Sequence, residues 1–266
     1  MTERRDRFRA LHADGIFVMP NPWDVGSAKL LAAMGFEALA TTSAGLAWSL
    51  GKLDMQVTRD ELVAHVAEVA AATPLPLNVD SERCFPGERG GVAETVRLLA
   101  DAGAAGCSIE DFDPATQEIE ALEVAAERVA IAAAGPLVLT ARAENHLHGV
   151  DDLDDTIARL LAYRDAGADV VYAPGLADLG SIARVVDEVG VPVNVLALPN
   201  GPSVSELGSV GVRRVSTGGA LARSAYGALL TSAEELREAG TSRYSERGVP
   251  AEALRAAFGR RYTSPP

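Results

Sequence analysis

The chain has 266 residues, of which 48% are apolar and 23% are charged, and its formal net charge is −13 at pH 7. This composition predicts a globular protein with a large core, and barrels of this length fold as one domain. The negative charge disfavours binding to nucleic acid or to anionic membrane surfaces, because both are held mainly by clustered Lys and Arg.

The N-terminal segment MTERRDRFRALHADG predicts a short surface helix, because it lacks the unbroken apolar core of a signal peptide. No later segment is long enough to span a bilayer. The two cysteines, Cys84 and Cys107, show no paired spacing and fit a reducing compartment better than a disulfide scaffold. We therefore expect a cytoplasmic location.

Eight short apolar runs alternate with Ala-rich segments of helical period. The candidate strands span residues 16–22, 38–43, 76–82, 106–111, 136–144, 169–175, 192–199 and 213–219. Apolar strands that alternate with helices predict a parallel sheet covered on both faces, and eight such units predict an α/β fold, a (β/α)8 TIM barrel. An open doubly wound sheet is the alternative, but no GxGxxG motif follows the first strand.

Three joints end in Ala-Gly or Met-Gly directly before a strand, in AAMGFEAL, ADAGAAGC and RDAGADVV. Each glycine is expected to end its helix in the left-handed conformation. After the eighth unit, residues 220–266 are expected to form a helical extension of the single domain 1–266. It contains a helix over 220–238, the polar joint GTSRYSERGVP and a final helix near 250–260. This extension could cap the barrel bottom or reach a partner subunit.

Acidic side chains follow three neighbouring candidate strands. The third ends in VDSE, which places Asp80 and Glu82 on one side by the two-residue period, the fourth ends in IED with Glu110, and Asp54 follows the second. Crowded carboxylates raise each other's pKa values unless a cation neutralises them, and an all-oxygen set suits Mg²⁺ or Mn²⁺ rather than zinc. We predict a divalent-metal site of Asp80, Glu82 and Glu110 at the barrel mouth.

Arg142 ends the fifth candidate strand in TARAE, beside these acids. Its planar guanidinium could hold a substrate carboxylate by two hydrogen bonds. It could equally neutralise Glu110 or Asp80, and the strand-end acids could pair with Arg83 or cap the following helices. The residues alone leave both interpretations open.

The eighth candidate strand runs into Ser216, Thr217, Gly218 and Gly219 directly before a helix. Backbone N–H groups at such a turn could bind phosphate, as in many barrels, or the turn could simply be capped by Ser or Thr. It supports a rival prediction, a phosphate-handling barrel enzyme that uses no metal.

Several motifs in order resemble the isocitrate lyase and phosphoenolpyruvate mutase superfamily over nearly the whole barrel. They are NPWDVGSAKLLAAMGFEALATTSAG, SLGKLD, VDSE, IED and TARAE. The resemblance implies four metal-binding acids, some acting through water: Asp54, Asp80, Glu82 and Glu110. We expect three catalytic residues: Arg142, Glu110 and Asp54. We expect five substrate-binding residues: Thr41, Thr42, Ser43, Arg142 and Asn194.

The chain departs from the family pattern in two loops. The acids of VDSE are followed by RCFPG in place of a Gly-aromatic-Gly turn. After the fourth strand, the lyases for isocitrate and methylisocitrate carry Lys-Lys-Cys-Gly-His and the phosphonomutases carry Lys and Asn. This chain reads EDFDPATQEIEALE there, so both chemistries lose their usual acid or nucleophile.

The resemblance still implies the core chemistry of the family. We expect a Mg²⁺-dependent lyase, with Mn²⁺ as a substitute, that cleaves a C–C or C–P bond in a small 2-oxo or 2-hydroxy carboxylate through a metal-stabilised enolate. Oxaloacetate-type or methylisocitrate-like acids would suit it. A catalytically silent barrel that binds a 2-oxo acid is a further alternative. The resemblance also implies a homo-oligomer, a dimer or tetramer, whose subunits exchange the final helix.

Overall fold

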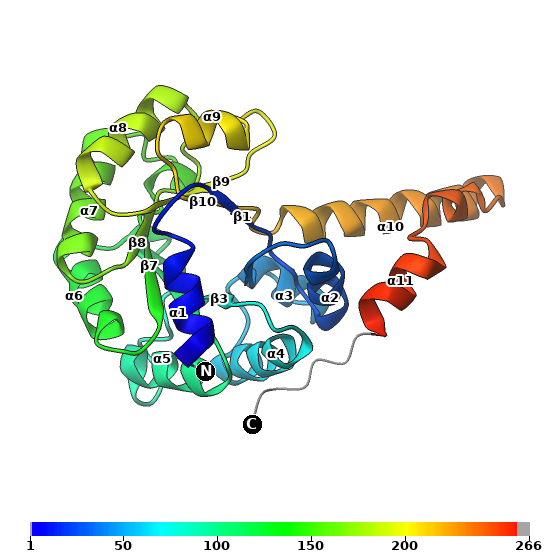
Figure 1. The fold of residues 1–266 in the computed structure, drawn as a ribbon, viewed down its shortest axis with the longest axis horizontal. Helices are drawn as coiled ribbons and strands as arrows, with labels where there is room; N and C mark the ends of the chain where they lie inside the picture. Colours follow the sequence, from blue (N-terminus) through cyan, green and yellow to red (C-terminus); the bar gives the residue numbers. More distant parts are fainter. Residues whose placement is uncertain (1, 260–266) are drawn as a thin grey trace.

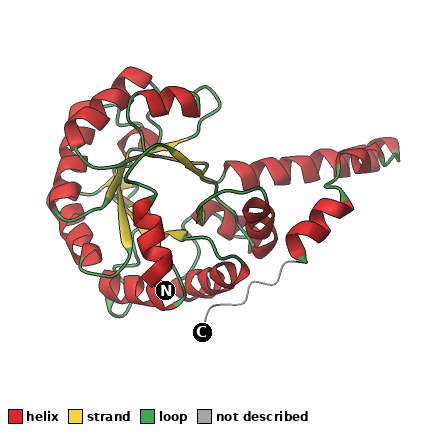
Figure 2. Ribbon diagram, in the orientation of Figure 1, coloured by secondary structure: helices red, strands yellow, loops and turns green. Residues whose placement is uncertain are grey.

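Eight parallel strands form the centre of the molecule, which the computed structural model describes from residue 2 to residue 259. Figure 2 shows them surrounded by helices. Their order is β1-β10-β9-β8-β7-β4-β3-β2. The strands are β1 (Phe17–Met19), β2 (Leu39–Ala40), β3 (Leu77–Asp80), β4 (Gly106–Glu110), β7 (Val138–Arg142), β8 (Val170–Tyr172), β9 (Val193–Leu196) and β10 (Arg214–Ser216). Each lies inside one predicted segment, so the prediction of an α/β barrel is confirmed.

The first and last strands in this order, β1 and β2, approach each other. The N–H of Ala40 donates to the carbonyl of Pro20 (3.1 Å), and the side-chain amide of Asn21 donates to the carbonyl of Thr41 (2.7 Å). The barrel is therefore nearly closed. Because the strands are parallel, their C-terminal ends all face one mouth.

Helices connect successive strands and cover the outside of the barrel (Figure 1). They are α2 (Val25–Ala33), α3 (Ser43–Ser49), α4 (Arg59–Ala72), α5 (Gly91–Asp101), α6 (Leu122–Ala133), α7 (Leu153–Asp165), α8 (Leu179–Val189) and α9 (Val204–Ser209). As predicted, Gly35, Gly103 and Gly167 are left-handed just after α2, α5 and α7, with φ of +91°, +104° and +106°. Because a Cβ is strained in this conformation, glycine ends each helix directly before the next strand.

The N-terminal helix α1 (Thr2–Ala10) is the short surface helix that the sequence predicts, but one of its described residues is buried. Phe8 is fully buried and packs in one cluster with Phe17 and Val138, at the starts of β1 and β7. The buried ring of His12 makes edge-on contacts with Phe8 and Phe17. The helix thus covers the end of the barrel opposite the mouth. The sequence did not predict this role, because a single phenylalanine among many charged residues gives no periodic apolar pattern.

The C-terminal extension leaves the barrel. The 20-residue helix α10 (Ala220–Ala239) projects outward (Figure 1), and Ala222 is its only buried residue. After η2 (Arg243–Arg247), helix α11 (Ala251–Phe258) returns to pack against α2. The extension does not cap the barrel bottom, which α1 covers. Residues 260–266 of the predicted extension lie outside the described residues. Within residues 2–259, no helix combines the length and apolar character needed to cross a membrane.

Candidate active site at the barrel mouth

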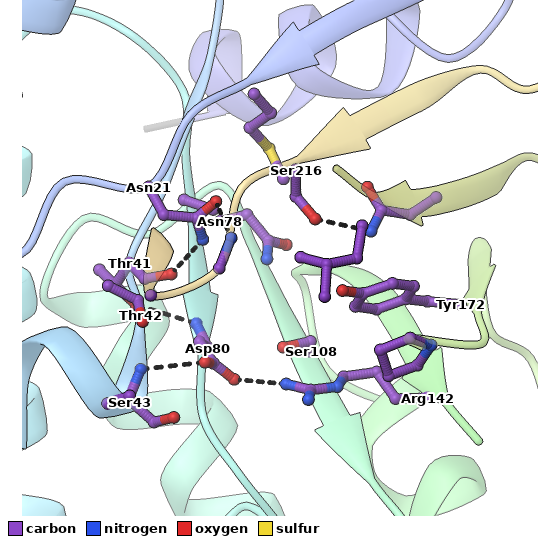
Figure 3. Close-up of a pocket in the computed structure, with 18 of the residues that line it drawn as sticks. Asn21, Thr41, Thr42, Ser43, Asn78, Asp80, Ser108, Arg142, Tyr172 and Ser216 are labelled. Carbon is purple, nitrogen blue, oxygen red and sulfur yellow. Dashed lines mark hydrogen bonds and ion pairs between the residues drawn. The ribbon is translucent and has the colours of Figure 1, made fainter. Parts of the chain in front are cut away.

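A cavity of about 170 Å³ lies among the C-terminal ends of the strands, where TIM barrels carry their active sites. Figure 3 shows polar side chains from several strands pointing into it. The predicted site residues that line it are Thr41, Thr42, Ser43, Asp54, Asp80, Arg142 and Asn194. The predicted acids Glu82 and Glu110 are not among its lining residues and lie beside it.

Asp80 ends β3 and is held from two sides. The backbone N–H of Ser43 donates to Asp80 Oδ2 (2.9 Å), and the backbone N–H of Asp80 donates to Thr41 Oγ1 (2.9 Å). Thr42 caps α3, because its side chain accepts the N–H of Gly45 (3.3 Å). The threonines and serine predicted to bind substrate therefore also position Asp80 and the start of α3.

Arg142, at the end of β7, pairs with the neighbouring acids, which is one of the two roles that the sequence left open. Its Nη1 lies 2.8 Å from Asp80 Oδ1 and 3.2 Å from Glu110 Oε2, and its Nε donates to Glu144 Oε1 (2.7 Å). Its guanidinium carbon is 5.4 Å from the ring centre of Tyr172. Among the described residues Nη2 donates no hydrogen bond, and Arg142 lines the cavity.

The acids carry more negative charge than Arg142 neutralises. Burial, and then Asp80 and Asp54, raise the pKa of Glu82 to about 8. Asp54 lies at the rim of the cavity, where partial desolvation of its carboxylate, followed by the negative charge of Asp80, raises its pKa. Burial also raises the pKa of Glu110, and its Oε1 is buried without a hydrogen-bond partner among the described residues. A cation would relieve all three effects.

The donor chemistry therefore fits a divalent cation. Among residues 2–259, however, no three His, Cys, Asp or Glu side chains are already placed to hold a metal ion directly. Asp80 and Glu110 bond to Arg142 instead. Mg²⁺ usually keeps several of its waters, so contact through water, or a turn of Asp80 away from Arg142, would reconcile the acids with a cation.

Several polar residues that line the cavity were not predicted as site residues: Asn21, Asn78, Ser108, Tyr172 and Arg214. Ser216, which the sequence placed in a candidate phosphate-binding turn, also lines the cavity, with Gly218 and Gly219. A signal was present, because most are polar residues inside apolar strand runs such as PLNVD and GCSIED. Inward positions of TIM-barrel strands are usually filled by Val, Ile or Leu. A polar residue at such a position therefore indicates a cavity rather than packed core.

The glycine-rich turn after β10 is already occupied. The N–H groups of Thr217 and Gly218 both donate to Asn21 Oδ1, at 2.9 and 3.0 Å, and the N–H of Asn21 donates to Thr217 Oγ1 (3.0 Å). Two donors that a phosphate would need thus fasten β1 to β10. This bonding weakens the prediction of a phosphate-handling enzyme.

The loop after β4 contains a short hairpin, β5 (Phe112–Asp113) and β6 (Glu118–Ile119), which is not among the predicted strands. Arg83 pairs with Asp113 (2.8 Å) and with Glu120, and Arg128 also pairs with Glu120. These ion pairs fix the hairpin against the barrel. Residues 111–121 contain no Lys, Cys or His.

The family model described as phosphoenolpyruvate phosphomutase matches residues 8–237. An uncharacterised protein of Mycobacterium tuberculosis H37Rv is 40% identical over 217 residues, covering 79% of this chain and 81% of the relative. The protein named "Probable 2-methylisocitrate lyase 2" of Corynebacterium glutamicum is 33% identical, and the match covers 72% of this chain and 66% of that relative. Oxaloacetate decarboxylase 2 of Pseudomonas fluorescens is 30% identical, and the match covers 86% of this chain and 81% of that relative.

A crystal structure of a "putative lyase/mutase" from Burkholderia cenocepacia J2315 matches with a TM-score of 0.92 and 50% identity, over 97% of this chain and 96% of that one. The match extends well beyond the barrel strands, so it includes most of the helical extension. Together with the family match over residues 8–237, these likenesses confirm the predicted enzyme class. The chain belongs to the isocitrate lyase and phosphoenolpyruvate mutase superfamily of lyases and mutases.

Proposed function

We propose that this enzyme is a divalent-metal-dependent lyase that cleaves a C–C bond, or alternatively a C–P bond, in a small 2-oxo or 2-hydroxy carboxylate. The observation that carries the proposal is the cavity that brings Asp54, Asp80 and Arg142 together. The relatives named for 2-methylisocitrate and oxaloacetate act on small acids, by their names, which agrees with this choice.

The volume of the cavity favours a small substrate. It measures about 170 Å³. A cavity of roughly 150 Å³ accommodates benzene, so this volume suits a compact ligand. Short oxo and hydroxy acids are of this size.

Four acids would hold Mg²⁺ or Mn²⁺, in part through water: Asp54, Asp80, Glu82 and Glu110. When bound, the cation supplies positive charge beside the substrate oxygen on which negative charge develops as the bond breaks. Arg142 orients the substrate, because Nη2 can donate to its carboxylate while Nη1 and Nε keep their acid partners.

The carbon that loses its bonding partner retains the electron pair and must gain a proton. The Tyr172 hydroxyl points into the cavity (Figure 3), and burial raises its pKa to about 12, so it is protonated at neutral pH. We propose Tyr172 as the donor of this proton, because the hairpin loop supplies no Lys, Cys or His.

Metal binding and turnover test this function separately. Mn²⁺ is titrated calorimetrically against wild type, Asp80→Asn and the exposed control Asp187→Asn, and a panel of 2-oxo and 2-hydroxy acids is assayed with Mg²⁺. We expect Asp80→Asn to bind Mn²⁺ at least about tenfold more weakly and the control to match wild type. Equal binding by Asp80→Asn would remove the metal site. Binding without turnover of any acid would favour a silent binding barrel.

A further inference from the structure

Arg214, at the start of β10, is a fully buried side chain without an acidic partner among the described residues. Its guanidinium donates to Asn194 Oδ1 (2.8 Å) and Thr140 Oγ1 (2.9 Å), and its Nη1 lies 3.2 Å from His12 Nε2. Arg142, in contrast, whose side chain is partly buried, contacts three carboxylates. A guanidinium has five N–H groups, so three neutral partners leave two without an acceptor in the protein.

An isolated buried cation is costly. Removing a charge from water costs several kcal/mol unless an opposite charge compensates it. Burial accordingly lowers the pKa of Arg214 to about 9. Since Val, Ile or Leu would fill this inward position without that cost, the position of Arg214 calls for an anion that the chain itself does not supply.

Arg214 lines the same cavity as Asp80 and Arg142, but deeper. It precedes Ser216 by two residues on β10, so both point inward and Arg214 lies one layer nearer the barrel bottom. The polar residues that line this deeper part are all neutral: Asn78, Ser108, Asn194 and Ser216, beside the apolar Met19 and Ala40. The cavity therefore has an acidic mouth and a cationic floor.

We propose that Arg214 and the neutral polar groups around it form an anion subsite at the cavity floor, which takes a second carboxylate of the substrate. The inference rests on the proposed function, because it assumes that the cavity binds the substrate. The first carboxylate faces Arg142 and the acids of the mouth, and the second points down the barrel toward Arg214. The substrate is then a small dicarboxylate rather than a monocarboxylate.

Two ligands that differ only in the second carboxylate provide the test. Malate carries a carboxylate where 2-hydroxybutyrate carries a methyl group, and calorimetry with Mg²⁺ measures both affinities. The variants are Arg214→Gln, Arg214→Lys as charge-conserving rescue, and the neighbouring Arg213→Gln as control. Arg213 is matched in sequence but partly exposed, with its nearest acid, Asp14, 3.8 Å away.

We expect wild type to prefer malate. Because truncating one partner of a buried charge pair costs 2 kcal/mol or more, Arg214→Gln should weaken malate binding at least about thirtyfold. Its binding of 2-hydroxybutyrate should change by less than about threefold, Arg214→Lys should recover part of the preference, and Arg213→Gln should resemble wild type. Equal weakening of both ligands would show that Arg214 only supports the fold and would overturn the subsite.

The wild-type comparison decides the matter even where Arg214→Gln fails to fold, because a wild type without preference for malate also overturns the proposal. The outcome is separable from that of the lyase assay. A preference for malate without turnover of any acid supports the subsite and removes the lyase. Turnover of monocarboxylates without a preference for malate supports the lyase and removes the subsite.

Discussion

His12 can accept a hydrogen bond from Arg214 only while its imidazole is neutral. Its Nδ1 lies 2.9 Å from the carbonyl of Phe8, so Nδ1 carries the hydrogen, and Nε2 is left to accept from Arg214 Nη1 (3.2 Å). Burial, followed by the positive charge of Arg214, lowers the pKa of His12 from 6.5 to about 3. One residue thus joins the N-terminal segment to the cavity floor.

This arrangement predicts a loss of stability in mild acid. Below pH 6.5 the unfolded chain takes up a proton at His12, whereas the folded chain does not until about pH 3. The free energy of unfolding should therefore fall by about 1.4 kcal/mol between pH 7.5 and pH 5.5 through this residue alone. Urea unfolding at both pH values measures it. His12→Gln keeps a donor and an acceptor but no ionisable group, so it should lose that part of the pH dependence. An unchanged slope in the variant would contradict the assignment.

At the scale of elements, the hairpin β5–β6 is held by a network with little access to solvent. The side chains of Arg83, Arg128 and Glu120 are 19%, 9% and 9% exposed, and Glu120 pairs with both arginines. Arg128 also donates to the carbonyls of Arg83 (3.2 Å) and Glu110 (3.1 Å). The same network therefore fixes the hairpin and the end of β4, from which Glu110 extends.

Glu120→Ala should consequently loosen the hairpin. It leaves two arginines short of a carboxylate partner, and breaking a buried ion pair on one side costs about 3 kcal/mol. We expect that loss in urea unfolding, with faster amide exchange over residues 112–119. Glu118→Ala lies in the same hairpin but is exposed and unpaired among the described residues, so it should change stability by less than about 0.5 kcal/mol. Equal effects of the two substitutions would refute the role of the network.

These elements also show which parts of the fold the sequence reveals. The eight strands were predictable because each is a local apolar run, and the helix ends at Gly35, Gly103 and Gly167 because glycine alone adopts their conformation easily. The hairpin was not predictable, since distant arginines from other elements hold it. The role of α1 was hidden for the same reason: Phe8 acquires its meaning only from strands far along the chain.

Over the whole molecule, some residues of the candidate site could be predicted from the sequence and others could not. Asp80, Arg142 and Glu110 were predictable because each follows an apolar strand, and parallel strands end at one mouth. The pairing of Arg142 with Asp80 and Glu110 remained open, since side-chain partners depend on register between strands. Arg214 was missed because a buried arginine without an acid partner violates the usual expectation for a strand interior.

The helix α10 of the C-terminal extension has exposed leucines that predict an oligomeric state. Leu229 and Leu230 are 61% and 64% exposed on a helix that projects from the barrel. Adjacent exposed leucines on an isolated helix favour contact with another chain, because covering them removes apolar surface from water. We therefore expect a homo-oligomer in solution, in which a second copy covers this helix.

Light scattering coupled to size-exclusion chromatography measures the mass of the particle. The double substitution Leu229→Glu and Leu230→Glu should shift it toward the mass of one chain, since two carboxylates would have to be buried at the contact. Val124→Glu is the matched control, because Val124 is 50% exposed but lies on α6, across the barrel from α10 (Figure 1). It should leave the mass unchanged. A wild type that already elutes as a single chain would show that the leucines of α10 have no partner copy.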